Sequence, residues 1–175
     1  DPTRGNNNNT GESDTAAVQT LSKALGLVAQ NGVIYLLNPV TVDSQMTLSN
    51  VTFRPGKSNM LGMLYISGDV TLNNIKIYNE TPDGRSCQFS NDPIRVTGTL
   101  TIGKGTRIES FLGKSCIYVS QGTLNLNGGK ILGDKQNTVE YGGGIYAEHA
   151  TVNVNGGTIS GHSATYGGGI YADNS

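Results

Sequence analysis

The chain has 175 residues, of which 35% are hydrophobic and 14% are charged, and its formal net charge is −1. This length and apolar content suit a single domain with a hydrophobic core. There is no lysine- and arginine-rich run of the kind found in nucleic-acid-binding proteins, and no stretch approaches the roughly 20 apolar residues of a spanning helix, so we expect neither a nucleic-acid partner nor membrane insertion in this segment.

The N-terminal segment, residues 1–14, is polar and rich in asparagine and glycine. It has little apolar surface to bury and is predicted to be a flexible tether. A capping helix is expected over residues 15–31, with Asp14 or Thr15 as its cap and Asn31 followed by glycine as its stop. The helix is indicated by apolar residues at three- and four-residue steps: Val18, Leu21, Leu25 and Val28.

Over residues 32–175, short runs of alternating apolar and polar residues are separated by Gly, Asn, Asp and Ser, which is typical of β-strands. One column of apolar residues recurs at intervals of between 23 and 30 residues: Val40, Leu64, Ile94, Ile117, Ile145 and Ile170. Two further columns, which begin at Leu48 and Phe53, follow the same period. Such a period indicates a solenoid, in which each strand pairs in parallel with its successor. Residues 15–175 are therefore predicted to form an all-β parallel β-helix domain, with three short strands per coil and an N-terminal α-helix.

The two ends of such a rod would expose unpaired strand edges and an open core. The helix over residues 15–31 is expected to cover the N-terminal end. At the other end, Ile170, Tyr171 and Ala172 begin a new coil just before Ser175. We therefore expect further β-helix coils of the same chain, with residues 32–175 as a truncated stack.

A column of large polar side chains beside the inward column is the main candidate for ligand binding. It contains Thr41, Tyr65, Arg95, Tyr118, Tyr146 and Tyr171, one from the first strand of each coil. Neighbours in such a column lie about 4.8 Å apart and can stack on one another. The column is either a side-chain ladder that stabilises the sheet or a surface on which sugar rings or a protein partner could lie.

On the same face, two residues further along, Glu148 and Asp173 are expected to lie side by side in neighbouring coils. Two stacked carboxylates repel each other, share a proton or share a cation such as calcium. Solvation with ordinary repulsion is the simpler explanation. No other cofactor or metal site is indicated by the sequence, so calcium at this pair is the one cofactor left open.

Several turn residues have predicted structural roles. The glycines at 142–144 and 167–169 mark a sharp corner at which φ can be positive. His149 and His162 are expected to be exposed turn residues. A column at the turn after the second strand is expected to form a hydrogen-bonded asparagine ladder: Ser49, Asn73, Gly103, Asn127 and Asn155.

Two segments, 79–92 and 134–141, are longer than the turns of the other coils and should project from the rod as loops, where binding specificity is often located. Cys87 lies in the first loop, and Cys116 lies near the end of a later coil. Their spacing fits no zinc motif. The two cysteines are either buried free thiols or one disulfide, which would hold the loop and imply an oxidising compartment.

The stretch GGGIYAEHATVNVNGGTISGHSATYGGGIY resembles the glycine-rich repeats of large surface-exposed bacterial proteins and adhesins, which are built on the right-handed, pectate-lyase-like (pectin lyase-like) parallel β-helix. The stretch QTLSKALGLVAQNGVIYLL is similar to the helix-plus-strand cap that begins many such domains. The resemblance covers residues 15–175 and implies a right-handed coil.

The resemblance also implies a function. It points to a non-catalytic segment of a secreted bacterial protein, which acts at the cell surface as a scaffold or adhesin and binds a glycan or a host surface protein. The residues expected to contact that ligand are Tyr65, Arg95, Tyr118, Tyr146, Glu148, Tyr171 and Asp173. The alternative is a polysaccharide lyase or glycoside hydrolase of the same fold, although this face has fewer carboxylates than such enzymes require.

Overall fold

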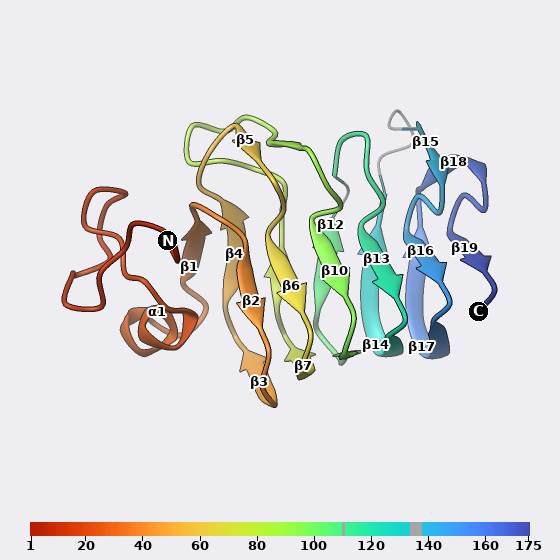
Figure 1. Cartoon of the computed structure of the whole chain (residues 1–175), viewed down its shortest axis with the longest axis horizontal. Coiled ribbons are helices and arrows are strands. Elements are labelled where there is room, and N and C mark those ends of the chain that lie inside the picture. The colour runs from red at the N-terminus through yellow and green to blue at the C-terminus, as the bar shows by residue number, and fades with distance from the viewer. Residues whose placement is uncertain (110, 134–137) are drawn as a thin grey trace.

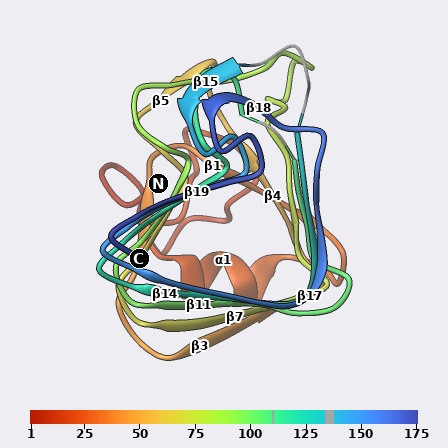
Figure 2. The same cartoon turned by 90° about the vertical axis from the view of Figure 1, so that its right-hand side faces the viewer.

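The computed structural model describes residues 1–109, 111–133 and 138–175. The described chain is a parallel β-solenoid of about five turns, with one short helix at its N-terminal end (Figure 1). Seen from the C-terminal end, the chain runs counter-clockwise as it advances toward the viewer, which is the right-handed sense (Figure 2). The predicted right-handed, all-β parallel β-helix is therefore confirmed. No helix in the described ranges is long and apolar enough to cross a membrane.

Each coil contributes one strand to each of three faces, which form a roughly triangular cross-section (Figure 2). The first face is a six-stranded sheet of β2 (Val40–Val42), β6 (Leu64–Ile66), β10 (Ile94–Val96), β13 (Ile117–Ser120), β16 (Ile145–Glu148) and β19 (Ile170–Asp173). The second face contains β3 (Met46–Ser49), β7 (Asp69–Asn73), β11 (Thr99–Ile102) and the first halves of β14 (Thr123–Leu132) and β17 (Thr151–Ser160). The third face contains β1 (Val33–Leu36), β4 (Thr52–Pro55), β8 (Lys76–Ile77), β12 (Arg107–Glu109) and the second halves of β14 and β17.

The three predicted inward columns are in register. The first is Val40, Leu64, Ile94, Ile117, Ile145 and Ile170; the second is Leu48, Leu72, Ile102, Leu126 and Val154; the third is Phe53, Ile77, Ile108, Ile131 and Ile159. They meet inside the coils in one continuous hydrophobic core. At the C-terminal end of the stack, Val154 and Ile170 are 52% and 37% exposed.

The helix α1 (Leu21–Leu27) lies across the N-terminal end of the core (Figures 1 and 2). Leu21 is buried in that core, which confirms the capping position. The helix is shorter than the predicted 15–31, and its cap is Thr20, whose side chain accepts a hydrogen bond from the Lys23 amide. The prediction of Asp14 or Thr15 as the cap was wrong. The backbone before Thr20 is instead bonded to the N-terminal segment.

Residues 1–11 run beside residues 16–20 through backbone hydrogen bonds. The Asn6 and Gly11 amides donate to the carbonyl oxygens of Ala17 and Ala16 at 3.0 and 2.9 Å. The side-chain oxygen of Asn7 accepts from the amides of Gln19 and Thr20, each at 3.0 Å. Flexibility of the segment remains a prediction, but in this structure its polar side chains supply hydrogen bonds at the helix entry.

The loop over residues 79–92 folds against the rod. It contains β9 (Gln88–Phe89), which pairs in parallel with β5 (Asn59–Met60). Cys87 and Phe89 are buried, and the Phe89 ring meets the Phe111 ring edge to face at 5.5 Å between centroids. Burial of these side chains holds the loop in place. Of the second predicted loop, residues 134–137 lie outside the described residues, and β15 (Thr138–Tyr141) pairs with β18 (Ser163–Tyr166).

Of the two alternatives for the cysteines, the structure has buried free thiols: Cys87 and Cys116 are not joined by a disulfide. Burial raises the pKa of Cys87 to about 11 and that of Cys116 to about 12. Both thiols therefore remain protonated at neutral pH, and they behave as small apolar side chains of the core.

The predicted corners are present, and the asparagine ladder is present at its last step, between Asn127 and Asn155. Gly142 and Gly167 have φ values of 52° and 60°, and a Cβ at either position would lie 2.2 Å from a carbonyl oxygen of the same corner. The Asn155 amide donates to the Asn127 side-chain oxygen at 2.9 Å, as expected for stacked asparagines. These two corners lie directly before β16 and β19 of the first face.

Candidate functional site

The predicted polar column lies in register along the first face. Tyr65, Arg95, Tyr118, Tyr146 and Tyr171 follow one another from β6 to β19. The Arg95 guanidinium lies 4.9 Å above the centre of the Tyr118 ring, the Tyr118 and Tyr146 ring centres are 5.1 Å apart, and those of Tyr146 and Tyr171 are 5.6 Å apart. These are distances of cation–π and aromatic packing. Tyr65 is placed in the column next to Arg95, on the side away from the stacked rings.

Two tyrosines that the sequence analysis missed join this stack. Tyr141 from β15 lies 4.7 Å from Tyr171 and 5.9 Å from Tyr146, and it stacks on Tyr166 from β18 at 5.3 Å and 18°. The tyrosine cluster is Tyr118, Tyr141, Tyr146, Tyr166 and Tyr171. Each of the two added tyrosines precedes a Gly-Gly-Gly corner. The first corner brings Tyr141 next to Tyr146, whereas Tyr166 stacks on Tyr141. The repeated phrase YGGGIY was the available signal.

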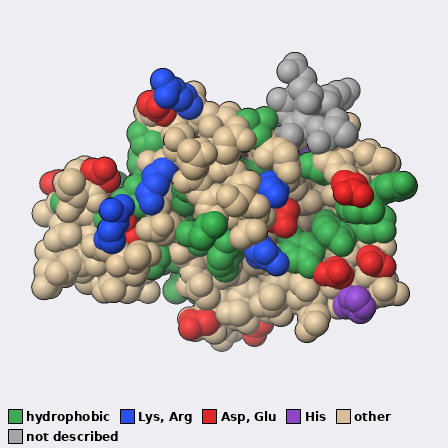
Figure 3. All heavy atoms as spheres, turned by 45° about the horizontal axis from the view of Figure 1, so that its top comes forward, with side chains coloured by type: hydrophobic (Ala, Val, Ile, Leu, Met, Phe, Trp, Pro, Cys, Tyr) green, Lys and Arg blue, Asp and Glu red, His purple; other side chains and the backbone are tan. Residues whose placement is uncertain are grey.

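Carboxylates border the tyrosine cluster. The Tyr118 hydroxyl donates a hydrogen bond to Glu148, and Glu148 lies in register with Asp173 of the next coil, as predicted. Burial, followed by the nearby Glu148 carboxylate, raises the pKa of both Tyr118 and Tyr146. A hydrogen bond to Glu140 raises the pKa of Tyr141. These three phenols are therefore neutral donors at physiological pH. Acidic side chains lie beside hydrophobic surface at the C-terminal end of the rod, on the right in Figure 3.

Glu148 and Asp173 are the predicted calcium pair. Within the described ranges, no third aspartate, glutamate, histidine or cysteine joins them in a group that could hold a metal ion. Two carboxylates provide at most four oxygens, whereas calcium takes six to eight oxygen ligands. The pair is better suited to accept hydrogen bonds from hydroxyl groups than to hold a cation by itself.

Asp92 is a further titratable group at the start of the first face. Burial raises the pKa of this carboxyl group, while the charges of Lys114 and Arg95 act in the opposite direction. Asp92 lies in the loop before β10, outside the repeat frame, so the column pattern did not indicate it.

His162 corrects another expectation. His149 is exposed and has a φ of 49°, as a turn residue should. His162 is only partly exposed, and its Nε2 atom lies 3.1 Å from the carbonyl oxygen of Ile131 in the preceding coil. The imidazole ring fits there because Gly133 and Gly144 lie against it. A Cβ atom at either position would approach the ring too closely.

Acidification should destabilise the solenoid through His162. Burial lowers the pKa of His162 below its ordinary value of 6.5, so the unfolded chain binds a proton more readily than the folded chain. The stability that a neutral His162 gives is present above pH 6.5, and it is lost as the pH falls from 6.5 toward the lower folded-state pKa. Urea unfolding between pH 7.5 and pH 5 measures this loss, which His162→Gln should reduce. The same substitution at exposed His149 is the control, and an equal effect of both would contradict the assignment.

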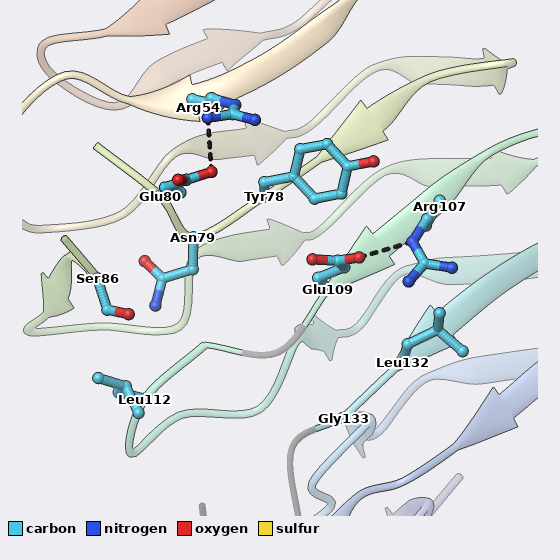
Figure 4. Close-up of a pocket in the computed structure, with 10 residues that line it drawn as sticks. All are labelled: Arg54, Tyr78, Asn79, Glu80, Ser86, Arg107, Glu109, Leu112, Leu132 and Gly133. Atoms are coloured by element: carbon cyan, nitrogen blue, oxygen red, sulfur yellow. Dashed lines mark hydrogen bonds and ion pairs between the residues drawn. The ribbon is translucent and has the colours of Figure 1, made fainter. Parts of the chain in front are cut away.

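A separate cleft of about 590 Å³ lies on the third face. Its lining residues are Arg54, Tyr78, Asn79, Glu80, Ser86, Arg107, Glu109, Leu112, Leu132 and Gly133 (Figure 4). Figure 4 shows an ion pair on either side of Tyr78: Arg54 with Glu80 at 2.7 Å, and Arg107 with Glu109 at 2.6 Å. The Arg54 guanidinium also lies 5.3 Å from the centre of the Tyr78 ring.

Of these cleft residues, Asn79, Glu80 and Ser86 fall in the predicted 79–92 loop, and the others were not singled out from the sequence. Tyr78 and Glu109 each follow an inward isoleucine by one position, so the repeat frame could have placed both on the third face. Glu80 and Ser86 belong to the 79–92 loop, whose fold the frame does not determine.

Comparison of the chain with protein-family models, with curated proteins and with solved structures found no match. The function has to be inferred from the surfaces of the solenoid themselves.

Proposed function

We propose that this chain is a non-catalytic segment of a secreted bacterial protein, and that its solenoid is a cell-surface scaffold and adhesin that binds a glycan through the tyrosine cluster. The observation that carries the proposal is the contact of five tyrosine rings, from the two-stranded β15–β18 sheet and the first face, beside carboxylates and Arg95.

The composition of the surface suits a sugar. Aromatic rings pack against the apolar C–H faces of a sugar, while phenol and carboxylate groups exchange hydrogen bonds with its hydroxyls. Tyr166, which is 53% exposed, offers accessible ring surface. Glu140, Glu148 and Asp173 would repel an anionic sugar, so the cluster favours a neutral or amino glycan.

The scaffold fixes the cluster before any ligand arrives. Tyr118, Tyr146 and Tyr171 belong to strands that pair along their whole length, and the pairing sets their spacing. Tyr141 and Tyr166 come from paired strands as well. A surface that is already ordered loses little conformational entropy on binding, which favours affinity for a ligand whose individual contacts are weak.

Alanine substitutions in the cluster test the proposal. Tyr146→Ala and Tyr166→Ala should each weaken binding to a neutral or amino glycan by roughly tenfold or more, as expected for an aromatic anchor. Tyr35→Ala is the matched control, because Tyr35 is exposed on the third face at the far end of the rod. Glycan-array screening followed by titration measures the change. Unchanged binding in both cluster variants, or binding only to a host surface protein, would refute the glycan assignment.

The alternative function is a polysaccharide lyase or glycoside hydrolase, and Asp92 is the observation that favours it. A carboxyl group whose pKa is raised by burial keeps its proton to a higher pH than an exposed carboxyl group does, which suits a general acid. Incubation with neutral and acidic polysaccharides should give no reducing ends and no unsaturated products. Product formation that Asp92→Asn abolishes would instead identify an enzyme.

A further inference from the structure

The third face carries a column of three cations in three consecutive coils. Lys76 of β8 pairs with Arg107 of β12, and Arg107 pairs with Lys130 of β14. We call these three residues the cationic ladder. Threonines flank it at both ends, since Thr52 pairs with Lys76 and Thr158 pairs with Lys130. The third face, to which these strands belong, runs along the right-hand side of Figure 2, away from the first face.

Stacking three like charges is unfavourable for the fold. Neighbouring coils are about 4.8 Å apart, and like charges directly opposite each other in a sheet are destabilising. Arg107 is paired with Glu109, but Lys76 and Lys130 are exposed. An outward column of the second face is built from neutral side chains instead: Thr47, Thr71 and Thr101 lie in register there. Strand pairing in this solenoid therefore does not require charged side chains at such positions. A counter-ion from outside the chain would remove the repulsion.

The cationic ladder adjoins the cleft of the third face. Arg107 belongs to both, and the cleft continues through Arg54 and Tyr78 in the next outward column. The Nε atom of Arg54 is buried and has no hydrogen-bond acceptor in the structure. The cleft thus combines an aromatic ring, two guanidinium groups that are each paired with a glutamate, and a volume comparable with that of a small saccharide (Figure 4).

We propose that the cationic ladder and the adjoining cleft bind a linear acidic polysaccharide. The polymer lies along the rod axis, its sulfate or carboxylate groups contact Lys76, Arg107 and Lys130, and one sugar unit enters the cleft against Tyr78. The charge-assisted contacts supply affinity, and the coil spacing is comparable with one pyranose unit of an extended chain. This site is separate from the tyrosine cluster. There the carboxylates of Glu140, Glu148 and Asp173 outnumber Arg95, whereas here Glu80 and Glu109 are balanced by arginines and the two lysines add positive charge.

A polysaccharide fits this surface better than a nucleic acid does. Each strand of duplex DNA carries a phosphate every 3.4 Å or so along its axis, which does not match a ladder with a step of about 4.8 Å. Single-stranded nucleic acid needs a row of aromatic side chains on which successive bases stack. Tyr78 is the one aromatic side chain among the residues that line the cleft.

Binding of defined polymers to the full chain tests the proposal. The probes are heparin for sulfate, polygalacturonate for carboxylate, dextran as the neutral polymer and a single-stranded oligonucleotide. Heparin or polygalacturonate should bind more tightly than dextran and the oligonucleotide, and the tighter of the two identifies the anionic group. Binding should weaken as salt is added, because salt screens exposed charges. Tighter binding of dextran or of the oligonucleotide would overturn the assignment.

Substitutions locate the site. Lys76→Gln with Lys130→Gln should weaken binding of the acidic polymer by roughly tenfold or more and make its salt dependence shallower. The control is Lys23→Gln with Lys104→Gln, which changes the net charge equally but leaves the ladder intact. The melting temperature of the ladder variant should be unchanged or higher, since repulsion has been removed. An equal loss in both double variants, or no loss in either, contradicts the ladder. Tyr146→Ala should leave acidic-polymer binding unchanged, so this site and the proposed glycan site can fail independently.

Discussion

Phe53→Ala should lower the free energy of unfolding by about 3 to 5 kcal/mol, the range measured when large aromatic residues are removed from cores. The Phe53 side chain is fully buried and lies in register between Ile34 and Ile77 in the third inward column. A solenoid coil has little freedom to collapse into the resulting space, because hydrogen bonds to both neighbouring coils fix the backbone. Most of the cavity should therefore remain.

Chemical denaturation measures this loss, with Phe53→Leu as the matched control. Leucine keeps an apolar side chain at the position and should cost less than the alanine variant. Tyr35→Ala, which removes an exposed aromatic residue from the neighbouring strand β1, should have a small effect. A loss below about 1 kcal/mol for Phe53→Ala would show that the coil relaxes around the missing ring.

Gly98→Ala should destabilise the solenoid by about 3 kcal/mol or more, at or beyond the upper end of ordinary overpacking. Gly98 forms the corner between β10 and β11. A Cβ atom there would lie 2.4 Å from the carbonyl oxygens of both Ser67 and Gly68 in the preceding coil. The obstructing atoms are backbone, so no side-chain rotation can make room. The coils would have to separate, and the hydrogen bond from the Thr99 amide to the Gly68 carbonyl would lengthen from 3.0 Å.

The control for this prediction is Gly26→Ala. Gly26 lies inside α1, and apart from its chain neighbours and the backbone of the helix itself, no heavy atom of the described residues lies within 4 Å of the position that a Cβ would occupy. Alanine should stabilise the helix there by about 0.5 to 1 kcal/mol. Thermal unfolding of the two variants should thus change in opposite directions. If Gly98→Ala is tolerated as well as Gly26→Ala, the close contact between the corners is not a feature of the folded protein.

The fold could be predicted because the same pattern of apolar residues recurs in the sequence of each coil. Columns such as Ile117, Ile145 and Ile170 share a position in the phrase, and parallel pairing brings equivalent positions together. The helix boundary could not be predicted in the same way. Val18 fits the helical pattern, yet residues before Thr20 form hydrogen bonds with the N-terminal segment, which no local pattern encodes.

The candidate site residues also fall into two groups: those in the repeat could be predicted, and those in irregular loops could not. The column from Tyr65 to Tyr171 was predictable, since its members occupy one place in the repeat. Lys76, Arg107 and Lys130 also occupy one place, directly before inward isoleucines, and the same alignment of coils could have found them. Ion pairs with loop residues could not be found, because the Glu80 partner of Arg54 depends on how an irregular segment packs.

The parallel pairing of successive coils also determines how the rod responds to a pulling force. Hydrogen bonds between coils, such as that from the Thr123 amide to the Gly98 carbonyl at 2.8 Å, are directed along the rod axis. Tension applied between the two ends of the rod therefore loads the outermost coil first and opens its bonds one after another. Each released coil lengthens the chain while the next coil stays intact, since a repeat contacts only its neighbours. A solenoid under tension would extend in steps of one coil and would keep the binding faces of the remaining coils assembled.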